Sequence, residues 1–342
     1  ASDEIGTGHV MRCLTLADAL YGRGAKCQFI CRDISGDLIE FIRLHGYEVV
    51  PLYQPILREP SLNIINWEYD ADRTSQIIGA KKVDWIIVDN YELDFRWELE
   101  LRKFCQRLLV IDDLANRSHE CDLLLDQNFH KNAKTLYSQL VPEDCRLLLG
   151  PNHVLLRSVF SQLPVREHSG NISNILIYFG ANDQDNQVGL SLAALEYFPQ
   201  LNVSVILGFN HPYRDIIYAK SRYMLNVNVV DLCPDIHSLM RWADFSFGVC
   251  GIAAWERCAV GLPSIVCSIA ENQKEDAFNL DRLGAVENLG DSRNVDTRLW
   301  VDALARVIDD PERVIKMSQA SLSVVKGWIQ NQNILLDLIC NE

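Results

Sequence analysis

The chain has 342 residues, of which 48% are hydrophobic and 23% charged, and its formal net charge is −14. A chain of this length has room for about two domains, and its composition is too apolar for a disordered protein. Nucleic acid is excluded as an expected partner, because a negatively charged protein without a block of Lys and Arg repels the phosphate backbone. Small molecules are not excluded, since helix N-termini and backbone amides can bind a diphosphate whatever the net charge.

The sequence also predicts where the protein resides. No stretch reaches the roughly 18 uninterrupted apolar residues of a membrane span, and no basic segment followed by an apolar one opens the chain. The eleven cysteines are scattered from Cys13 to Cys340 without a Cys-x-x-Cys pair, which is typical of reduced thiols. We therefore expect a cytoplasmic protein without stable membrane association.

The first 150 residues alternate between short runs rich in Val and Ile and longer amphipathic stretches. This alternation predicts parallel strands connected by helices. The expected strands lie at 26–31, 47–52, 83–88, 107–112, 123–125 and 146–149, and the expected helices at 10–20, 36–45 and 93–105. A glycine-rich loop that opens a helix normally follows a strand, yet only five residues precede Gly6, so we expect the first sheet to lack that strand.

A second series of strands and helices follows a candidate linker at 151–171, which contains Pro151, Pro164 and Gly170. Its expected strands lie at 173–179, 203–207, 227–230, 243–247 and 264–268, and its expected helices at 186–197, 251–260, 271–283 and 311–338. We therefore predict an α/β protein with two Rossmann-like domains, at 1–150 and 172–325, whose parallel sheets face a cleft. A C-terminal helix at 326–342 would pack back on the first domain.

The segment Gly6-Thr7-Gly8-His9 places two glycines and a histidine at the start of the first expected helix. Backbone N–H groups at a helix N-terminus lack partners within the helix, which favours an anion or a polar substrate there. We predict His9 as a general base and Gly6, Gly8 and Arg12 as substrate contacts. The alternative is a glycine turn in which His9 only caps the helix.

Two further loops follow expected strands, where ligands of parallel sheets bind. After the strand at 173–179 we predict Gly180, Asn182 and Asp183 as substrate contacts, with helix capping by Asp183 as the alternative. After the strand at 83–88 we predict Tyr91, which can stack on or hydrogen-bond to a sugar, with simple core packing as the alternative.

Glycines also precede the helix expected at 251–260, and an acid lies about one turn inside it. Amides near Gly251 can hold a diphosphate, and Glu256 can accept hydrogen bonds from two ribose hydroxyls, unless it is solvated or salt-bridged. The next strand ends in Glu271-Asn272-Gln273, three polar residues that we also predict as substrate contacts.

Taken together, these motifs resemble the bacterial UDP-2,4-diacetamido-2,4,6-trideoxy-β-L-altropyranose hydrolases of pseudaminic acid biosynthesis, which are related to GT-B glycosyltransferases. The motifs are Gly6-Thr7-Gly8-His9-Val10-Met11-Arg12-Cys13, Gly150-Pro151, Phe179-Gly180, Trp255-Glu256-Arg257-Cys258, Gly261-Leu262-Pro263-Ser264 and Glu271-Asn272-Gln273. The resemblance covers nearly the whole chain and implies a GT-B-like fold that binds a UDP-sugar.

By the same resemblance, His9 is the catalytic base, Asn272 contacts substrate, and Gly251 and Glu256 bind the diphosphate and the ribose. The chain departs from the family in three places. The first strand and an Arg-x-Asp are absent before Ala1, Asn90 replaces an expected His, and 252–254 replace a more hydroxyl-rich helix start. The last two departures concern substrate detail more than reaction class.

The implied reaction is hydrolysis of the anomeric C–O bond with inversion, in which His9 deprotonates water and UDP leaves. We predict no cofactor and no metal, because the histidines show no metal-ligand spacing. Two alternatives remain open at this point. One is an inverting GT-B glycosyltransferase that activates an acceptor hydroxyl, and the other is a non-catalytic protein that binds nucleotide sugars.

Overall fold

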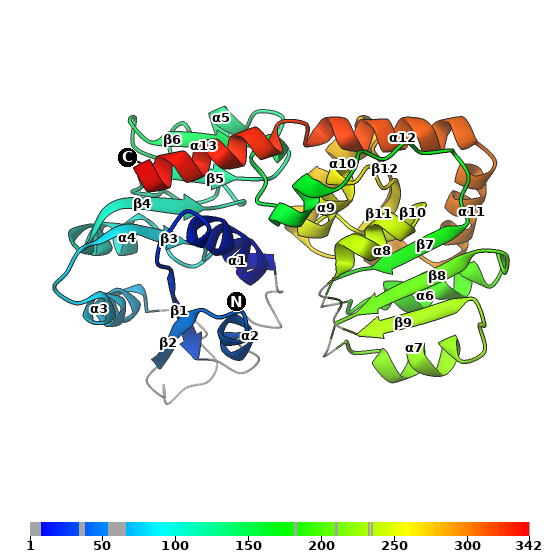
Figure 1. Cartoon of the computed structure of the whole chain (residues 1–342), viewed down its shortest axis with the longest axis horizontal. Coiled ribbons are helices and arrows are strands. Elements are labelled where there is room, and N and C mark those ends of the chain that lie inside the picture. The colour runs from blue at the N-terminus through cyan, green and yellow to red at the C-terminus, as the bar shows by residue number, and fades with distance from the viewer. Residues whose placement is uncertain are drawn as a thin grey trace. The chain divides into compact units, whose positions relative to one another are not determined.

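The computed structural model describes residues 8–33, 38–53, 66–180, 183–208, 211–231, 233 and 235–341. The chain forms two compact units. Unit 1 comprises Ala1–Leu155 together with Gln330–Glu342, and unit 2 comprises Leu156–Ile329. Each unit contains a parallel sheet covered by helices (Figure 1). The division falls within the stretch expected to be a linker, and the C-terminal residues belong to unit 1.

Unit 1 contains two parallel sheets. Its elements are α1 (Gly8–Tyr21), β1 (Gln28–Asp33), α2 (Ile39–Leu44), β2 (Glu48–Tyr53), α3 (Trp67–Ile78), β3 (Val83–Val88), α4 (Phe95–Leu101), β4 (Cys105–Ile111), β5 (Leu123–Asp126), α5 (Ala133–Tyr137), β6 (Arg146–Leu149) and α13 (Trp328–Asn341). Strands β3 to β6 form one sheet in chain order, while β1 and β2 pair with each other. The expected absence of a first strand concerns residues before Gly8, which lie outside the described part.

The four-stranded sheet of unit 1 is buried on both faces because successive residues of β4 point to opposite sides. Leu109 and Ile111 pack with residues of α1 and α13, among them Leu16 and Leu335. Leu108 and Val110 pack on the other side with residues of α3, α4 and α5. The C-terminal helix is also tied by a hydrogen bond of 3.0 Å from the Trp85 indole to the Ile339 carbonyl.

Unit 2 contains one six-stranded parallel sheet in the order β12-β11-β10-β7-β8-β9. Its elements are β7 (Asn174–Tyr178), α6 (Gln187–Leu195), β8 (Asn202–Leu207), α7 (Arg214–Ser221), β9 (Val227–Asp231), α8 (Ile236–Trp242), β10 (Phe245–Val249), α9 (Ile252–Ala259), β11 (Ser264–Ser268), α10 (Lys274–Arg282), β12 (Val286–Asp291), α11 (Thr297–Ile308) and α12 (Pro311–Val324). The chain order reverses between β7 and β10, so the loops after these strands lie at the switch point where open α/β sheets bind ligands.

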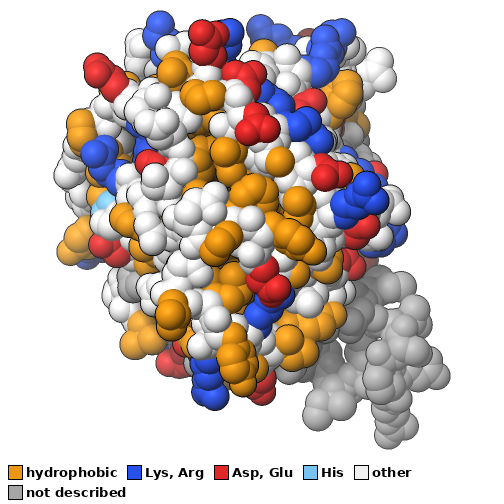
Figure 2. All heavy atoms as spheres, turned by 90° about the vertical axis from the view of Figure 1, so that its right-hand side faces the viewer, with side chains coloured by type: hydrophobic (Ala, Val, Ile, Leu, Met, Phe, Trp, Pro, Cys, Tyr) orange, Lys and Arg blue, Asp and Glu red, His pale blue; other side chains and the backbone are white. Residues whose placement is uncertain are grey.

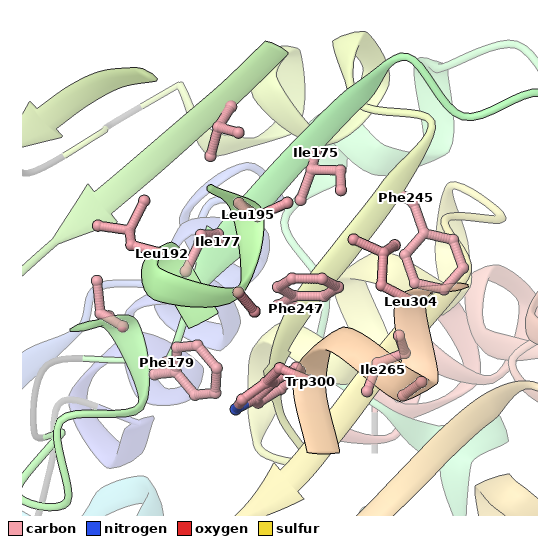
Figure 3. Packing of buried hydrophobic residues seen from close by; sticks show 14 of the residues in the cluster. Ile175, Ile177, Phe179, Leu192, Leu195, Phe245, Phe247, Ile265, Trp300 and Leu304 are labelled. Atoms are coloured by element: carbon pink, nitrogen blue, oxygen red, sulfur yellow. The ribbon is translucent and has the colours of Figure 1, made fainter. Parts of the chain in front are cut away.

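The core of unit 2 joins the sheet to α11 (Figure 3). Trp300 packs against Phe247 of β10 and Phe179 after β7, with ring centroids 4.8 and 5.6 Å apart. Its indole donates a hydrogen bond of 2.9 Å to the buried side-chain oxygen of Gln187, which satisfies the polar ends of both residues. Figure 2 looks onto unit 2 and shows exposed hydrophobic side chains between charged ones on this face.

The predicted fold class is confirmed, and every expected strand overlaps a strand of the structure. Apart from short 3₁₀ turns, six elements in the described part of the chain were not among the expected ranges: α3, α5, α7, α8, α11 and β12. Strand β12 contains Glu287, Asn288 and Asp291 and lies at the sheet edge, so it lacks the apolar run that marks an interior strand. The helix expected at 311–338 is two helices, because α12 ends at Val324 and α13 begins at Trp328.

Gly248 lies where β10 passes close to β7. A Cβ at this position would lie 2.6 Å from the Tyr178 carbonyl oxygen and 2.8 Å from Nη1 of Arg257. Because a backbone atom cannot move aside, we expect Gly248→Ala to lower the free energy of unfolding by about 1 to 3 kcal/mol. Urea unfolding checks this, with Gly22→Ala as the control because its Cβ would meet ordinary contacts at 3.5 Å. Equal midpoints for the two variants would contradict the packing argument.

Candidate active site

Two side chains from distant parts of unit 1 meet at the start of α1. Nδ1 of His9 lies 2.5 Å from Oδ1 of Asp89, which directly follows β3. The His9 side chain is 12% exposed and the Asp89 side chain 2%. A carboxylate at Nδ1 holds the proton on that nitrogen and leaves Nε2 free to accept another proton. The pair therefore has the arrangement of a general base and the carboxylate that orients it.

Arg12 connects this pair to a second carboxylate. Its Nε and Nη2 donate to the two oxygens of Asp89, each at 2.6 Å, and its Nη1 donates to Asp113 at 3.0 Å. Burial alone would raise the pKa of Asp89, but the charges of Arg12 and His9 outweigh it and hold that pKa well below its usual range. Asp89 is therefore ionised at neutral pH, as an orienting carboxylate must be.

Tyr91 completes the cluster. Its ring meets the His9 imidazole edge-on, with centroids 4.4 Å apart. Burial and the negative charge of Asp113 raise the pKa of the Tyr91 hydroxyl, which hydrogen-bonds to Asp113. The hydroxyl thus stays protonated, and one side of the imidazole is covered.

Formal charges show what the cluster can do. Arg12 carries one positive charge, and Asp89 and Asp113 carry one negative charge each, so the three groups sum to −1. A proton gained by His9 during proton transfer would bring the formal charge of the cluster to zero. The arrangement can therefore deprotonate water or a hydroxyl.

The sequence motif predicted His9, Arg12 and Tyr91, and the structure brings these three together. It did not predict Asp89 or Asp113. Both residues follow the apolar end of a strand, at Val88-Asp89 and Ile111-Asp112-Asp113. An acid at this position is the sequence pattern from which they could have been predicted as site residues. Gly8 begins α1, and Gly6 lies outside the described residues.

In unit 2, the loop after β7 contains Gly180, whose φ of 82° suits glycine. Asp183 is fully buried, and its two oxygens accept hydrogen bonds of 2.8 Å from the amides of Gln187 and Val188. Asp183 therefore binds the first amides of α6, in agreement with the helix-capping alternative, although the N-cap residue is Asn186. Its contact with substrate stays a prediction. Asn182 is not among the described residues.

The loop after β10 leads directly into α9. Gly251 is the N-cap of this helix and has no side chain that could cap its first turn. The Ala254 amide of that turn donates to the Gly251 carbonyl at 2.8 Å, and the first N–H groups of a helix are where anions bind. A Cβ on Gly251 would lie 3.9 Å from Nε2 of Gln273, so the loops after β10 and β11 face each other. Arg257, which is buried behind them, donates to the Val249 carbonyl at 2.7 Å.

Glu256 is largely buried, and its Oε1 accepts hydrogen bonds of 3.2 and 2.9 Å from Nε and Nη2 of Arg157. Burial raises the pKa of Glu256, and the charge of Arg157 opposes that rise. The salt-bridged alternative thus describes this residue, with Oε1 already engaged. No pattern in the sequence pointed to Arg157, because it lies 99 residues away from Glu256 in the chain.

The three polar residues after β11 have different surroundings. Glu271 is exposed and pairs with Lys274 at 2.5 Å. Gln273 accepts a hydrogen bond of 3.2 Å from the Ile269 amide through its Oε1, which leaves its Nε2 near Gly251. Asn272 is half-buried between them. These residues gather at the carboxyl ends of β10 and β11, as the topology predicted.

Other classes of site receive no support from the described residues. Among them, no group of His, Cys, Asp or Glu is arranged to hold a metal ion, and no helix has the length and apolarity to span a membrane. A shallow depression of about 620 Å³ lies at the amino ends of β8 and β9, beside Leu225 and Trp242. It is at the opposite edge of the sheet from the loops described above.

No protein-family model matches the sequence. The structure is similar to MurG of Acinetobacter baumannii, with a TM-score of 0.63 and 13% identity over 98% of this chain and 97% of that one. It is also similar to UGT89C1 of Arabidopsis thaliana complexed with UDP, with a TM-score of 0.66 and 13% identity over 96% and 95% of the two chains. The chain therefore has the α/β GT-B fold, with two Rossmann-like units.

Curated proteins give two sequence relatives. The chain is 24% identical to the spore coat polysaccharide biosynthesis protein SpsG of Bacillus subtilis, over 99% of this chain and 96% of that protein. It is also 24% identical to the protein MJ1062 of Methanocaldococcus jannaschii over 80% of this chain. The chain spans only 55% of the length of MJ1062.

Asp89 makes the stability of unit 1 depend on pH. Because its folded pKa is depressed, its ionised form stabilises the fold above the unfolded pKa of about 3.9, and this contribution disappears as the pH falls through the folded pKa. We expect Asp89→Asn to lower the free energy of unfolding by about 3 kcal/mol at pH 7, and by less as the pH falls below about 4. Urea unfolding across this pH series measures the difference.

The matched control is Asp84→Asn, which changes an exposed carboxylate on the same strand. Its effect should stay within about 0.5 kcal/mol. A pH-independent loss in Asp89→Asn would show that the variant perturbs packing and not the ion pair.

Proposed function

We propose that the protein hydrolyses a UDP-linked sugar at the anomeric C–O bond, with His9 as the general base and Asp89 as its orienting carboxylate. The observation that carries this proposal is the contact of 2.5 Å between Nδ1 of His9 and Asp89. The GT-B fold supports a nucleotide sugar as the substrate class, since neighbours of this fold were solved in complex with UDP.

In the proposed reaction, Nε2 of His9 removes a proton from a water molecule as its oxygen attacks the anomeric carbon. The bond from that carbon to the UDP oxygen breaks with inversion, and the electron pair leaves on the diphosphate. Arg12 and Asp89 hold the imidazole while it is charged. UDP is a good leaving group, so the site needs amide stabilisation of the departing phosphate and no strong acid.

Unit 2 would bind the UDP portion of the substrate. The start of α9 at Gly251, where the N-cap has no side chain, suits the diphosphate. Glu256, held by Arg157, would accept from the ribose through its remaining oxygen. Gly180, Asn272 and Gln273 belong to adjacent loops, and we propose them as further substrate contacts together with Gly8 and Tyr91. Gly6, Asn182 and Glu271 stay predictions from the sequence.

The resemblance of the sequence motifs favours a UDP-linked 2,4-diacetamido-2,4,6-trideoxy sugar, and thus a step of pseudaminic acid biosynthesis. The relative SpsG is named for polysaccharide biosynthesis, which is compatible with an enzyme that supplies or transfers a sugar. The second candidate is an inverting glycosyltransferase, because the same imidazole can deprotonate a sugar hydroxyl and MurG and UGT89C1 share the fold. Release of UDP without an acceptor separates the two.

We expect the wild-type protein to release UDP from UDP-2,4-diacetamido-2,4,6-trideoxy-β-L-altropyranose in the absence of any acceptor. His9→Asn and Asp89→Asn should each lower kcat by about 100- to 10,000-fold, because a general base acts only when it is correctly held. The double variant should be little slower than His9→Asn, since the two residues act as a unit. A coupled assay for UDP measures all four proteins.

His45→Asn serves as the control, because His45 is an exposed histidine of the same unit. Full activity in folded His9→Asn would overturn the assignment of the base. UDP release that requires an added sugar acceptor would favour the transferase.

Glu256→Gln tests the nucleotide site separately from chemistry. The amide loses the negative charge that pairs with Arg157 and faces the ribose, so we expect about 10-fold weaker UDP binding. The loss should be smaller for 2′-deoxy-UDP, which lacks one of the hydroxyls. Calorimetric titration measures both affinities, with Glu196→Gln as a control at an exposed glutamate of unit 2 that pairs with Lys220. Unchanged UDP affinity would remove Glu256 from the site.

A further inference from the structure

The loop that follows β3 carries both Asp89 and Tyr91, so its position decides whether the His9 imidazole is held. Two of its backbone carbonyls are bound by one side chain. Nη2 of Arg117 donates to the Asn90 carbonyl at 2.9 Å, and Nε of Arg117 donates to the Leu93 carbonyl at 2.8 Å. These two contacts lie on either side of Tyr91 in the sequence.

The same guanidinium is fixed at its third nitrogen. Nη1 of Arg117 donates to Oδ1 of Asp112 at 2.6 Å, and the Asp112 side chain is fully buried while that of Arg117 is 14% exposed. Burial tends to raise the pKa of Asp112, but the charge of Arg117 together with the hydrogen bonds from Ala115 and Tyr137 and the nearby His119 lowers that pKa. Arg117 thus joins the loop after β3 to the end of β4.

Two further hydrogen bonds fix the position of the Asp112 side chain. Its Oδ2 accepts hydrogen bonds of 2.9 Å from both the Ala115 amide and the Tyr137 hydroxyl. Ala115 has a φ of 47°, a left-handed conformation that disfavours a residue with a Cβ and that the Asp112 contact maintains. The tight turn from Asp112 brings Arg117 back toward the loop after β3.

Asp113, the residue after Asp112, connects this turn to Arg12 and Tyr91 beside His9. Asp113 accepts from Arg12 of α1 and hydrogen-bonds with Tyr91 of the loop after β3. The adjacent Asp112 and Asp113 are thus both connected to the groups around His9. Displacement of the loop after β3 would move Asp89 and Tyr91 together, away from His9.

We propose that Arg117 is a positioning residue for the His9–Asp89 pair, and this inference rests on the proposed function for its kinetic consequence. The three nitrogens of the guanidinium donate to Asn90, Leu93 and Asp112, and Nη1 makes a further contact of 3.3 Å with Oδ1 of Asn116. Lysine has one nitrogen on a flexible stem and cannot hold the three in the same plane. Arg117 touches neither the imidazole nor a substrate in this arrangement, and it acts through the loop.

The first measurement reads the state of His9 without substrate. In protein with ¹⁵N-labelled histidine, ring nitrogen shifts report which nitrogen carries the proton, and His9→Asn identifies the signals of His9. We expect the wild type to show the Nδ1–H tautomer, because Asp89 accepts from that nitrogen. Arg117→Lys should shift these signals toward a mixture of tautomers.

The second measurement is kinetic. We expect Arg117→Lys to lower kcat for UDP release by about 10- to 100-fold with little change in KM, because a small displacement of a positioning group slows the chemical step. Arg102→Lys is the matched control, since Arg102 pairs with Asp122 elsewhere in unit 1. This control should change neither the His9 signals nor kcat.

Unchanged His9 signals in folded Arg117→Lys, or equal shifts in Arg102→Lys, would overturn the positioning role. If Arg117→Lys does not fold, Asp112→Asn decides the question, because it removes the charge that fixes Nη1 and should shift the His9 signals in the same direction. If the wild type releases no UDP, the proposed hydrolysis fails, and the His9 signals still test the role of Arg117.

Discussion

The two-point contact between Arg12 and Asp89 is the interaction on which the rest of the candidate site depends. A carboxylate that is 2% exposed loses its hydration, and only paired donors can compensate for that loss. Arg12 supplies two donors to Asp89 and a third to Asp113, so it neutralises one carboxylate and bridges to the other. Asp89 can then remain ionised beside His9, which is the condition for holding a proton on Nδ1 and leaving Nε2 available.

The parallel sheet of unit 1 explains why these groups meet. Strands β3 and β4 are neighbours in register, with Val88 opposite Val110, so the residues that follow them emerge at the same edge. The loops after these strands carry Asp89, Tyr91, Asp112 and Asp113. Helix α1 packs on the sheet through Leu16 and presents its first turn to the same edge. Rigid elements thus fix the short contacts, and loops supply the chemical groups.

In unit 2, the loops at the carboxyl edge of the sheet carry different chemical groups. Its loops after β7, β10 and β11 contain glycines and amides, and its buried acids are already engaged. Asp183 binds the amides at the start of α6 and Glu256 pairs with Arg157, so both of these buried acids already have partners. Helix α9 begins at Gly251, an N-cap without a side chain.

The sequence alone determined the fold class, because periodic apolar runs and the glycine-rich motif at 6–8 report local structure. It also indicated His9, Arg12 and Tyr91, which belong to a short motif or to a strand end. Asp89, Arg117 and Arg157 depended on tertiary structure, since their partners lie far away in the chain or on another loop. The same reason applies to Asp183, whose carboxylate could serve a ligand or cap a helix. The tertiary structure shows that this carboxylate is buried and binds the two amides at the start of α6, because an ionised group removed from water must bind the nearest donors.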